Sequence, residues 1–269
     1  MSKRKIVINP KFQNLAPLVE KLPGKVSKEG TVIYKGRNII YRLPLENMEV
    51  TVKCFHVPAL LNRFVYTYLR AGKAKRSYEN ALRLEELGIG TPEPIAYIEN
   101  YEGGLLKESY YICRMDKGSI IRHWETEVPD YRNMVKALGA FMFELHQKGI
   151  YHRDFSPGNI LFTVDNGVYH FKLVDINRMR FGVHDKNTLY NNFRSLNIDS
   201  EEETARVGRE YARAAHLDEK MMEDIAVGKL RAYHAEKARH RKLKKLIGKH
   251  NQFTQLSDTN NNGERATHV

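Results

Sequence analysis

Short runs of β-branched and aromatic residues recur through the first part of the chain, separated by Gly, Asn and charged residues typical of turns. Their short length and spacing are typical of antiparallel strands rather than of helices. We predict five strands, at 31–35, 38–43, 49–55, 94–98 and 109–115.

Helical periodicity appears first between the third and fourth of these strands. Apolar residues follow helical spacing over 58–68 and again over 81–87, where Gly88 is the expected end of the second helix. A longer helix is predicted over 131–148 and ends at Gly149. One face of this helix is apolar, formed by Met134, Leu138, Phe141, Met142 and Leu145.

Strands gathered in the first half and helices in the second predict an α+β protein with two lobes. The first lobe is assigned to 1–115, with the five-stranded sheet and a helix, and the helical second lobe to 116–250. The join is expected near 116–118. The Asn-rich end at 251–269 lacks apolar periodicity and is predicted to be a disordered polar tail.

The composition is that of a globular protein, with 42% hydrophobic and 28% charged residues. The basic start has too few apolar residues for a secretion signal, and no segment reaches the roughly 18 apolar residues of a spanning helix. The two cysteines, Cys54 and Cys113, lie in apolar strand-like runs. We therefore expect a cytoplasmic protein with reduced thiols.

The net charge of +12 indicates an anionic partner. The predicted helical stretch 229–250 carries much of this charge, with nine Lys or Arg and one Glu. Two interpretations are open: a solvated helix face, or peripheral contact with the anionic inner face of the cell membrane. No nucleic-acid-binding module is recognisable, so no nucleic acid partner is expected.

The most specific motif is His152-Arg153-Asp154, followed by Asn159 five positions after the aspartate. This is the spacing of a kinase catalytic loop. A predicted strand at 168–174 then leads to Asp175. Phosphoryl transfer requires a carboxylate that accepts the proton of the acceptor hydroxyl and oxygen ligands that hold Mg²⁺ on the phosphates of ATP. We predict Asp154 as the catalytic base and Asn159 and Asp175 as the metal ligands.

A cation is also needed at the nucleotide phosphates, and in kinases it is a strand lysine paired with a helical carboxylate. Lys53, on the third predicted strand, is the candidate for phosphate binding. Glu79 on the following helix is its expected partner, with Glu85 and Glu86 on the same helix as alternatives.

Four basic or imidazole side chains near these residues have predicted supporting roles. His152 and Arg153 are expected to brace the catalytic loop through hydrogen bonds. Arg178 and Arg180 closely follow the metal-ligand aspartate and are candidates for binding an anionic acceptor, with pairing to a nearby carboxylate as the alternative.

With these motifs, the chain resembles the lipopolysaccharide kinase family of the protein-kinase-like superfamily. The resemblance covers about 31–181 and rests on Val52-Lys53, the helix containing 76–79, the loop 152–159 and the segment 174–178. It implies a two-lobed kinase fold, ATP as the phosphoryl donor, and a hydroxyl of a Kdo or heptose sugar as the acceptor.

Departures from the protein-kinase pattern favour a small-molecule or glycolipid acceptor. Ser156 stands where Ser/Thr kinases place a lysine, Ile176-Asn177 replaces Phe-Gly, and no Ala-Pro-Glu segment follows. Gly30 and Gly36 do not form a glycine-rich phosphate loop. Two alternatives stay open: an atypical Ser/Thr protein kinase, and a catalytically silent scaffold with a kinase-like fold.

Overall fold

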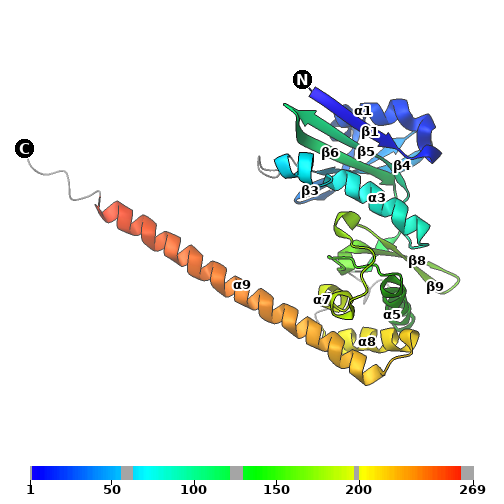
Figure 1. The fold of residues 1–269 in the computed structure, drawn as a ribbon, viewed down its shortest axis with the longest axis vertical. Helices are drawn as coiled ribbons and strands as arrows, with labels where there is room; N and C mark the ends of the chain where they lie inside the picture. Colours follow the sequence, from blue (N-terminus) through cyan, green and yellow to red (C-terminus); the bar gives the residue numbers. More distant parts are fainter. Residues whose placement is uncertain (1, 56–62, 122–129, 197–199, 262–269) are drawn as a thin grey trace, which may run out of the picture.

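The structure is a computed structural model that describes residues 2–55, 63–121, 130–196 and 200–261, with side chains as far as residue 242. Figure 1 shows two lobes stacked along one axis and a long C-terminal helix that projects away from them. The predicted α+β fold with a β-rich first lobe and a mainly helical second lobe is confirmed.

The first lobe is built on an antiparallel sheet of six strands, in the order β1-β5-β6-β4-β3-β2. The strands are β1 (Ser2–Ile8), β2 (Thr31–Lys35), β3 (Asn38–Leu45), β4 (Met48–Phe55), β5 (Pro94–Glu102) and β6 (Leu105–Arg114). The five predicted strands are all present, but the prediction of a five-stranded sheet was wrong, because the sheet contains one further strand. The additional strand, β1, pairs with β5 along its whole length and contains the basic run Lys3-Arg4-Lys5, which hid its strand pattern.

Helices cover both faces of this sheet. The 3₁₀ helix η1 (Pro10–Leu15) leads into α1 (Ala16–Glu29), which buries Val19, Leu22 and Val26 in a core with Val50 and Val52 of β4. The π-helical turn η2 (Val65–Leu69) precedes α3 (Lys73–Glu86), which packs on the other face. Part of the helix predicted over 58–68 lies outside the described residues.

Strand alternation then determines where Lys53 points. Side chains on a strand alternate between faces, so Lys53 faces away from the α1 side to which Val50 and Val52 belong. Its antiparallel partner in the register is Tyr111, which belongs to the core on the α3 side. Lys53 is thereby placed between the sheet and the second lobe.

The second lobe combines a small sheet with helices. Strands β7 (Ser119–Ile120), β8 (Ile160–Asp165) and β9 (Val168–Leu173) form an antiparallel sheet in that order. The helices are α5 (Tyr131–Gln147), η4 (Pro157–Asn159), η5 (Ile176–Arg178), α6 (Lys186–Leu189), α7 (Asn191–Leu196), α8 (Glu201–Ala215) and α9 (Glu219–Asn261). Near the predicted join at 116–118, Asp116 accepts hydrogen bonds from Gly118 N (2.9 Å) and Lys172 Nζ (2.5 Å).

A disordered tail was predicted from residue 251. The structure differs as far as residue 261, because α9 continues without a break to Asn261. No proline interrupts this part of the chain, so the backbone hydrogen bonds of the preceding helical segment can continue into it. Residues 262–269 of that prediction lie outside the described part. Within the described residues, no helix has both the length and the apolar character required to cross a membrane.

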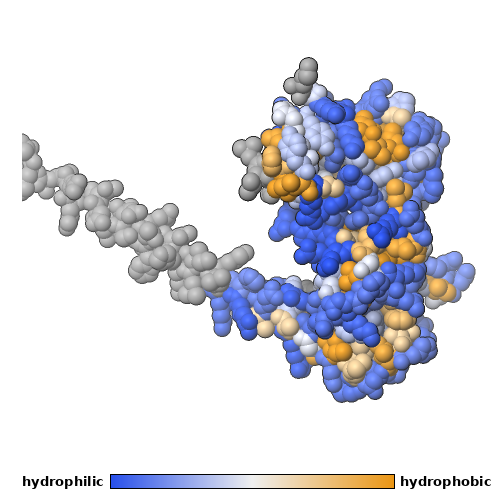
Figure 2. Space-filling view, in the orientation of Figure 1, coloured by the Kyte–Doolittle hydropathy of each residue, from blue (hydrophilic) through white to orange (hydrophobic). Residues whose placement is uncertain are grey.

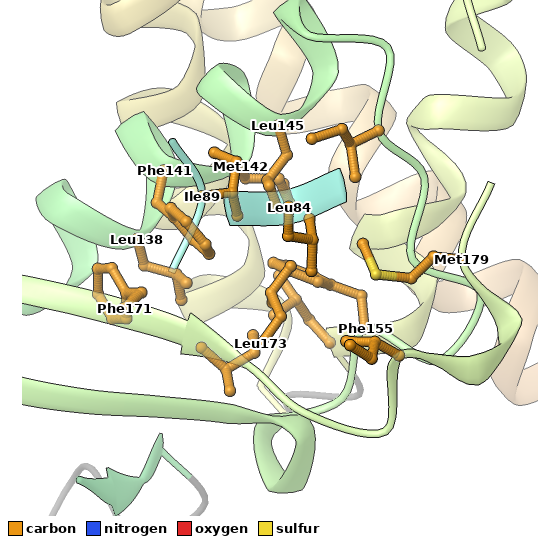
Figure 3. Packing of buried hydrophobic residues seen from close by; sticks show 14 of the residues in the cluster. Leu84, Ile89, Leu138, Phe141, Met142, Leu145, Phe155, Phe171, Leu173 and Met179 are labelled. Atoms are coloured by element: carbon orange, nitrogen blue, oxygen red, sulfur yellow. The ribbon is translucent and has the colours of Figure 1, made fainter. Parts of the chain in front are cut away.

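One hydrophobic core joins the lobes. Figure 3 shows Leu84 of α3 and the following Ile89 packed among side chains of α5, β9 and the catalytic loop. Backbone bonds reinforce this contact: Leu173 N donates to Gly90 O at 2.9 Å, and the Thr91 hydroxyl donates to Leu173 O at 2.9 Å. The lobes therefore hold the residues at their junction in a fixed relation.

Candidate active site

The catalytic loop begins where α5 ends. Gly149 adopts φ +67°, a left-handed conformation that glycine takes without steric cost, and so terminates the helix. The next residues bring His152 into the core, where only 1% of its surface is exposed. Its Nε2 donates to Val174 O at 3.0 Å, and its Nδ1 accepts the Asp154 backbone N–H at 3.1 Å. His152 therefore braces the loop as predicted.

Protonation of His152 is opposed by its surroundings. Burial lowers the pKa of this imidazole, although the bond to Val174 O and the nearby carboxylates of Asp175 and Asp154 act in the other direction. The neutral ring can accept at one nitrogen and donate at the other, which both observed hydrogen bonds require.

A second row of hydrogen bonds supports the loop from the helices below it. The buried Asn192 of α7 donates to His152 O at 2.7 Å and accepts from His146 Nε2 at 3.0 Å. The other ring nitrogen of His146, Nδ1, accepts from the Tyr211 hydroxyl of α8 at 3.1 Å. This chain, from Tyr211 through His146 and Asn192, links α8 to the catalytic loop.

Asp154 and Asn159 are held by backbone contacts that leave their oxygens available. Asn159 Nδ2 donates to Asp154 O at 2.9 Å, which orients the amide and leaves its oxygen free among the described residues. The Asp154 side chain is exposed and lies on the surface of a cavity. Asp154 therefore presents its carboxylate where a substrate hydroxyl can reach it.

Asp175 sits in a strained turn directly after β9. Its φ and ψ of 53° and 41° are left-handed, a conformation that costs a non-glycine residue about 1–3 kcal/mol and is often found at functional sites. Its Oδ1 accepts hydrogen bonds from Lys53 Nζ and from Asn177 Nδ2, the latter at 2.7 Å. Val174 N donates to Asn159 O at 3.0 Å and so places the two predicted metal ligands next to each other.

The charge state of Asp175 follows from this pairing. Burial favours the neutral acid, but the ammonium group of Lys53, with smaller contributions from His152 and Arg178, outweighs burial and lowers the pKa of the carboxyl. Asp175 is therefore an anion at neutral pH. The sequence prediction placed Lys53 and Asp175 at one site, and the structure brings them into direct contact.

The predicted ion pair between Lys53 and Glu79 is not formed and has to be corrected. Glu79 lies on the outer face of α3, with 52% of its side chain exposed, and pairs with Lys75 on its own helix at 3.5 Å. Neither of the alternatives, Glu85 and Glu86, forms an ion pair with Lys53 in the described structure. The buried face of α3 instead carries Ala74, Ser77, Tyr78, Ala81 and Leu84.

Basic residues take the place near Lys53 where an acidic partner was expected. The pKa of Lys73 is lowered by burial and by the charges of Arg178, Arg76 and Lys53, against the opposing effect of Asp175. Lys73 and Arg178 thus bring two further positive charges close to the Lys53–Asp175 pair, a suitable environment for phosphate groups. Sequence reasoning missed Lys73 and Arg76, although basic residues in the first turn of a helix, where the macrodipole disfavours them, were a usable signal.

Arg178 and Arg180, the two candidates for acceptor binding, lie in different surroundings. Arg178 is near enough to Lys73, Arg76 and Asp175 to affect their pKa values, whereas Arg180 pairs its backbone with Tyr151 at the start of the catalytic loop. Arg153 does not brace the loop as predicted. Its side chain is exposed and has no hydrogen-bond or ion-pair partner among the described residues.

A cavity of about 370 Å³ opens beside Asp154 on the second lobe. It is lined by Tyr151, Arg153, Asp154, Ser156, Asn191, Arg194, Ser195 and Tyr233. Its lining combines the catalytic loop with α7 and α9, so residues far apart in the sequence meet beside the candidate base. No sequence motif marked Arg194 or Tyr233, since only the packing of α9 on α7 brings them there.

The residues around Asp175 fit a hard divalent cation. Mg²⁺ is held in proteins by one or two carboxylate or amide oxygens, with substrate phosphates and water completing its shell. Asp175 Oδ2 and the side-chain oxygen of Asn159 have no partner within the described residues. Asn159 comes immediately before β8, and Asp175 follows the end of the neighbouring strand β9. The described residues contain no cluster of three or more His, Cys, Asp or Glu that could hold a metal without a substrate.

Comparison with solved structures gives matches over most of the chain. Among solved structures, WaaP in complex with acyl carrier protein matches with a TM-score of 0.60 and 16% identity, covering 87% of this chain and 98% of that one. A microcompartment-associated aminopropanol kinase matches with a TM-score of 0.53 and 10% identity, covering 80% and 86%. These likenesses show the fold. No curated protein gives a significant sequence match.

The family comparison is more specific. The profile of the lipopolysaccharide kinase (Kdo/WaaP) family matches residues 35–215, which include Lys53, the catalytic loop and Asp175. This match extends over more than half of the 269 residues. The chain therefore belongs to the lipopolysaccharide kinase (Kdo/WaaP) family, and it is a phosphotransferase that acts on a hydroxyl acceptor.

Proposed function

We propose that this protein transfers the γ-phosphoryl group of ATP to a hydroxyl of a Kdo or heptose sugar in a lipopolysaccharide core. The observation that carries the proposal is the convergence of Lys53, Asp175 and Asn159 at the lobe junction, next to the exposed carboxylate of Asp154. In the proposal, Asp154 is the base, Lys53 is the phosphate-binding cation, and Asn159 and Asp175 supply the metal-ligating oxygens that phosphoryl transfer requires.

In the proposed reaction, Asp154 receives the proton of the acceptor hydroxyl. The acceptor oxygen forms a bond to the γ-phosphorus while the bond from that phosphorus to the β–γ bridging oxygen breaks, leaving ADP. Lys53 binds the phosphates, assisted by the nearby positive charges of Lys73 and Arg178. Because the transferred group spreads its charge over several oxygens, these cations stabilise the transition state electrostatically.

Asn159 and Asp175 are the proposed ligands of Mg²⁺. When bound, the metal neutralises phosphate charge and orients the phosphates for transfer. Lys53 occupies one oxygen of Asp175, so the second oxygen is the one available to the metal. Arg178 and Arg180 remain candidates for acceptor binding. Reversing the charge of both should raise the KM of the acceptor, and an unchanged KM would exclude them.

The test is ATP-dependent incorporation of labelled phosphate into Kdo–lipid A or a core oligosaccharide. Wild type should label the glycan in the presence of Mg²⁺, and labelling should stop on chelation. Asp154→Asn keeps the size of the side chain but removes the base, so it should lower kcat by about 10²–10⁴-fold. Thermal unfolding of the variant provides the control for correct folding.

Two other functions are distinguished in the same experiment. An atypical protein kinase would label itself or an added protein and leave the glycan unlabelled. A silent scaffold would label nothing and would not bind ATP. Glycan labelling that persists in Asp154→Asn would contradict the proposed role of this residue.

We place the enzyme at the cytoplasmic face of the membrane, where its glycolipid acceptor would be accessible. The support is the basic surface of α9, whose described residues Lys237, Arg239, Arg241 and Lys242 are exposed. Figure 2 shows hydrophilic residues on the part of α9 that leaves the second lobe.

A further inference from the structure

Three cations gather where α3 meets η5, and we refer to Lys73, Arg76 and Arg178 together as the α3–η5 cation cluster. Lys73 and Arg76 are three positions apart at the start of α3 and so project from the same side of the helix. Arg178 is the last residue of η5. Asp175, the carboxylate that affects both Lys73 and Arg178, already pairs with Lys53. No ion pair joins a member of the cluster to a carboxylate among the described residues.

Arg76 is the member with the least favourable surroundings. Its side chain is half-buried, and its Nε is shielded from water without a hydrogen-bond partner in the described structure. Burial lowers the pKa of Arg76, and the positive charges of Arg70 and Arg178 lower it further. A shielded donor on a cation is costly when no acceptor faces it. A bound anion would supply that acceptor.

Lys73 connects the cluster to the proposed nucleotide site. The ammonium groups of Lys53 and Lys73 lie 5.5 Å and 5.9 Å from the centre of the same ring, that of Phe55. Burial lowers the pKa of Lys73, and so do the charges of Arg178, Arg76 and Lys53. The cluster is therefore a neighbour of the lysine that is proposed to bind the phosphates.

The two elements that carry the cluster are fixed to each other. Asn80 Nδ2 of α3 donates to Ile176 O of η5 at 2.7 Å, and Leu84 and Ile176 belong to the same buried core. Cations held in this way need little ordering when an anion binds. The hairpin between β2 and β3 has no glycine-rich loop whose backbone N–H groups could hold phosphates, so side chains have to do more of this work.

We propose that the α3–η5 cation cluster binds the phosphate chain of the nucleotide directly, with Arg76 as its principal ligand. Arg76 and Lys73 then act from the helix that in other kinases offers a carboxylate to the strand lysine. The inference rests on the proposed function and deepens it by adding Arg76 to the phosphate-binding residues. The planar guanidinium can donate two parallel hydrogen bonds to one phosphate, whereas Lys73 contributes a point charge.

Nucleotide binding tests this role without depending on turnover. Arg76→Met removes the charge and keeps an unbranched apolar side chain in the half-buried position. Calorimetry in the presence of Mg²⁺ should show ATP binding at least about tenfold more weakly to this variant than to wild type. Adenosine, which has no phosphate, should bind both proteins equally, as measured by ligand-observed NMR. Lys73→Met should show the same pattern.

Lys75→Met is the matched control. It removes one positive charge from the same helix, but Lys75 pairs with Glu79 on the outer face at 3.5 Å. Its affinity for ATP should stay within about twofold of wild type. Thermal unfolding without ligand separates binding from a structural role. Because Arg76 has no partner in the described structure and is repelled by its neighbours, Arg76→Met should unfold at the temperature of wild type or above it.

Four results would overturn the inference. They are an unchanged ATP affinity in Arg76→Met, equal losses of ATP and adenosine binding, an equal loss of ATP binding in Lys75→Met, and a lower unfolding temperature of Arg76→Met. Glycan labelling by wild type tests the proposed function separately. A labelled glycan with unchanged ATP affinity in Arg76→Met would reject the cluster and leave the kinase function standing. Wild-type protein that neither binds ATP nor labels a glycan would reject the proposed function and the inference with it.

Discussion

At the scale of single residues, the pairing of Lys53 with Asp175 rather than with Glu79 makes a sharp prediction. Lys53→Met should lower kcat/KM by about 10²–10³-fold, because it removes the cation nearest the proposed phosphate site. Glu79→Gln should stay within about threefold of wild type, since this side chain is exposed and pairs only with Lys75. Steady-state kinetics with varied ATP would measure both effects.

The control for this comparison is Lys75→Met, which removes the partner of Glu79 and should behave like Glu79→Gln. A loss in Glu79→Gln as large as that in Lys53→Met would contradict the prediction. It would mean that α3 rotates on nucleotide binding and brings Glu79 to Lys53.

His146 gives a prediction about the pH dependence of stability. Burial lowers its pKa from 6.5 to about 4, despite the bond to Asn192. As pH falls below 6.5, the unfolded chain binds a proton that the folded protein does not bind until about pH 4, so folding is progressively destabilised over this window. At pH 5 the loss from this residue is about 2 kcal/mol.

The variant His146→Gln tests this effect, because glutamine stays neutral and can still donate to Asn192. Urea unfolding at pH 7.5 and pH 5 would measure the free energy of unfolding of both proteins. The variant should lose about 2 kcal/mol less than wild type between the two pH values. Equal losses would show that His146 is protonated in the folded state.

The sequence could predict those parts of the site that are held by contacts between residues close together in the chain. The catalytic loop is an example. Its hydrogen bonds join His152, Asp154 and Asn159 to one another or to Val174, just before Asp175, so the spacing of the motif was sufficient to predict the loop. The partner of Lys53 depends on which face α3 turns to the sheet. Spacing alone could not determine that rotation.

At the scale of elements, α8 and α9 cross so closely that one glycine is required. A Cβ on Gly208 would come within 2.8 Å of Met222 O and 3.0 Å of Ala226 Cβ. We expect Gly208→Ala to lower the free energy of unfolding by about 1–3 kcal/mol, because overpacking outweighs the gain in helix propensity. Gly228→Ala is the matched control in α9, where a Cβ meets nothing within 4 Å.

The control should raise stability by about 0.5–1 kcal/mol, since alanine loses less conformational entropy than glycine in a helix. Urea unfolding of the two variants therefore gives opposite signs if the helices pack as described. Stabilisation by both substitutions would show that α8 and α9 are further apart.

The basic surface of α9 leads to a second prediction at this scale. Sedimentation with liposomes should deplete the protein from solution when the vesicles contain anionic lipid, and not when they are zwitterionic. Replacing Arg239, Arg241 and Lys242 by Gln should reduce binding by roughly 1 kcal/mol for each charge near the membrane surface. Equal sedimentation of wild type and variant would favour a solvated helix face.

The strands and helices of the first lobe show the same limit of sequence reasoning. The run 31–35 was predicted to the residue because its β-branched pattern is uninterrupted and turn residues bound it. Strand β1 was missed because Lys3, Arg4 and Lys5 dominate its composition, and its pairing with β5 depends on a partner about 95 residues away. Strand β1 therefore depends on pairing with a distant strand, which the local sequence pattern does not indicate.

At the scale of the whole molecule, two lobes might be expected to unfold separately, but the core argues against this. Leu84 and Ile89 come from the first lobe, and Leu138, Met142 and Leu145 from the second, and all of them belong to one buried cluster (Figure 3). Separating the lobes would expose this cluster to water at a cost of about 25 cal/mol for each Å² of apolar surface. Each lobe would lose part of its buried apolar surface without the other.

We therefore predict a single cooperative thermal transition, with equal calorimetric and van't Hoff enthalpies. Leu84→Ala, in the shared cluster, should cost about 2–5 kcal/mol and lower the Tm by about 5–15 °C. Leu22→Ala is the informative comparison, because Leu22 lies in the separate core between α1 and the sheet. If the lobes unfold together, it should shift the same transition without splitting it. Two calorimetric peaks, of which Leu22→Ala moves only one, would show that the first lobe unfolds on its own.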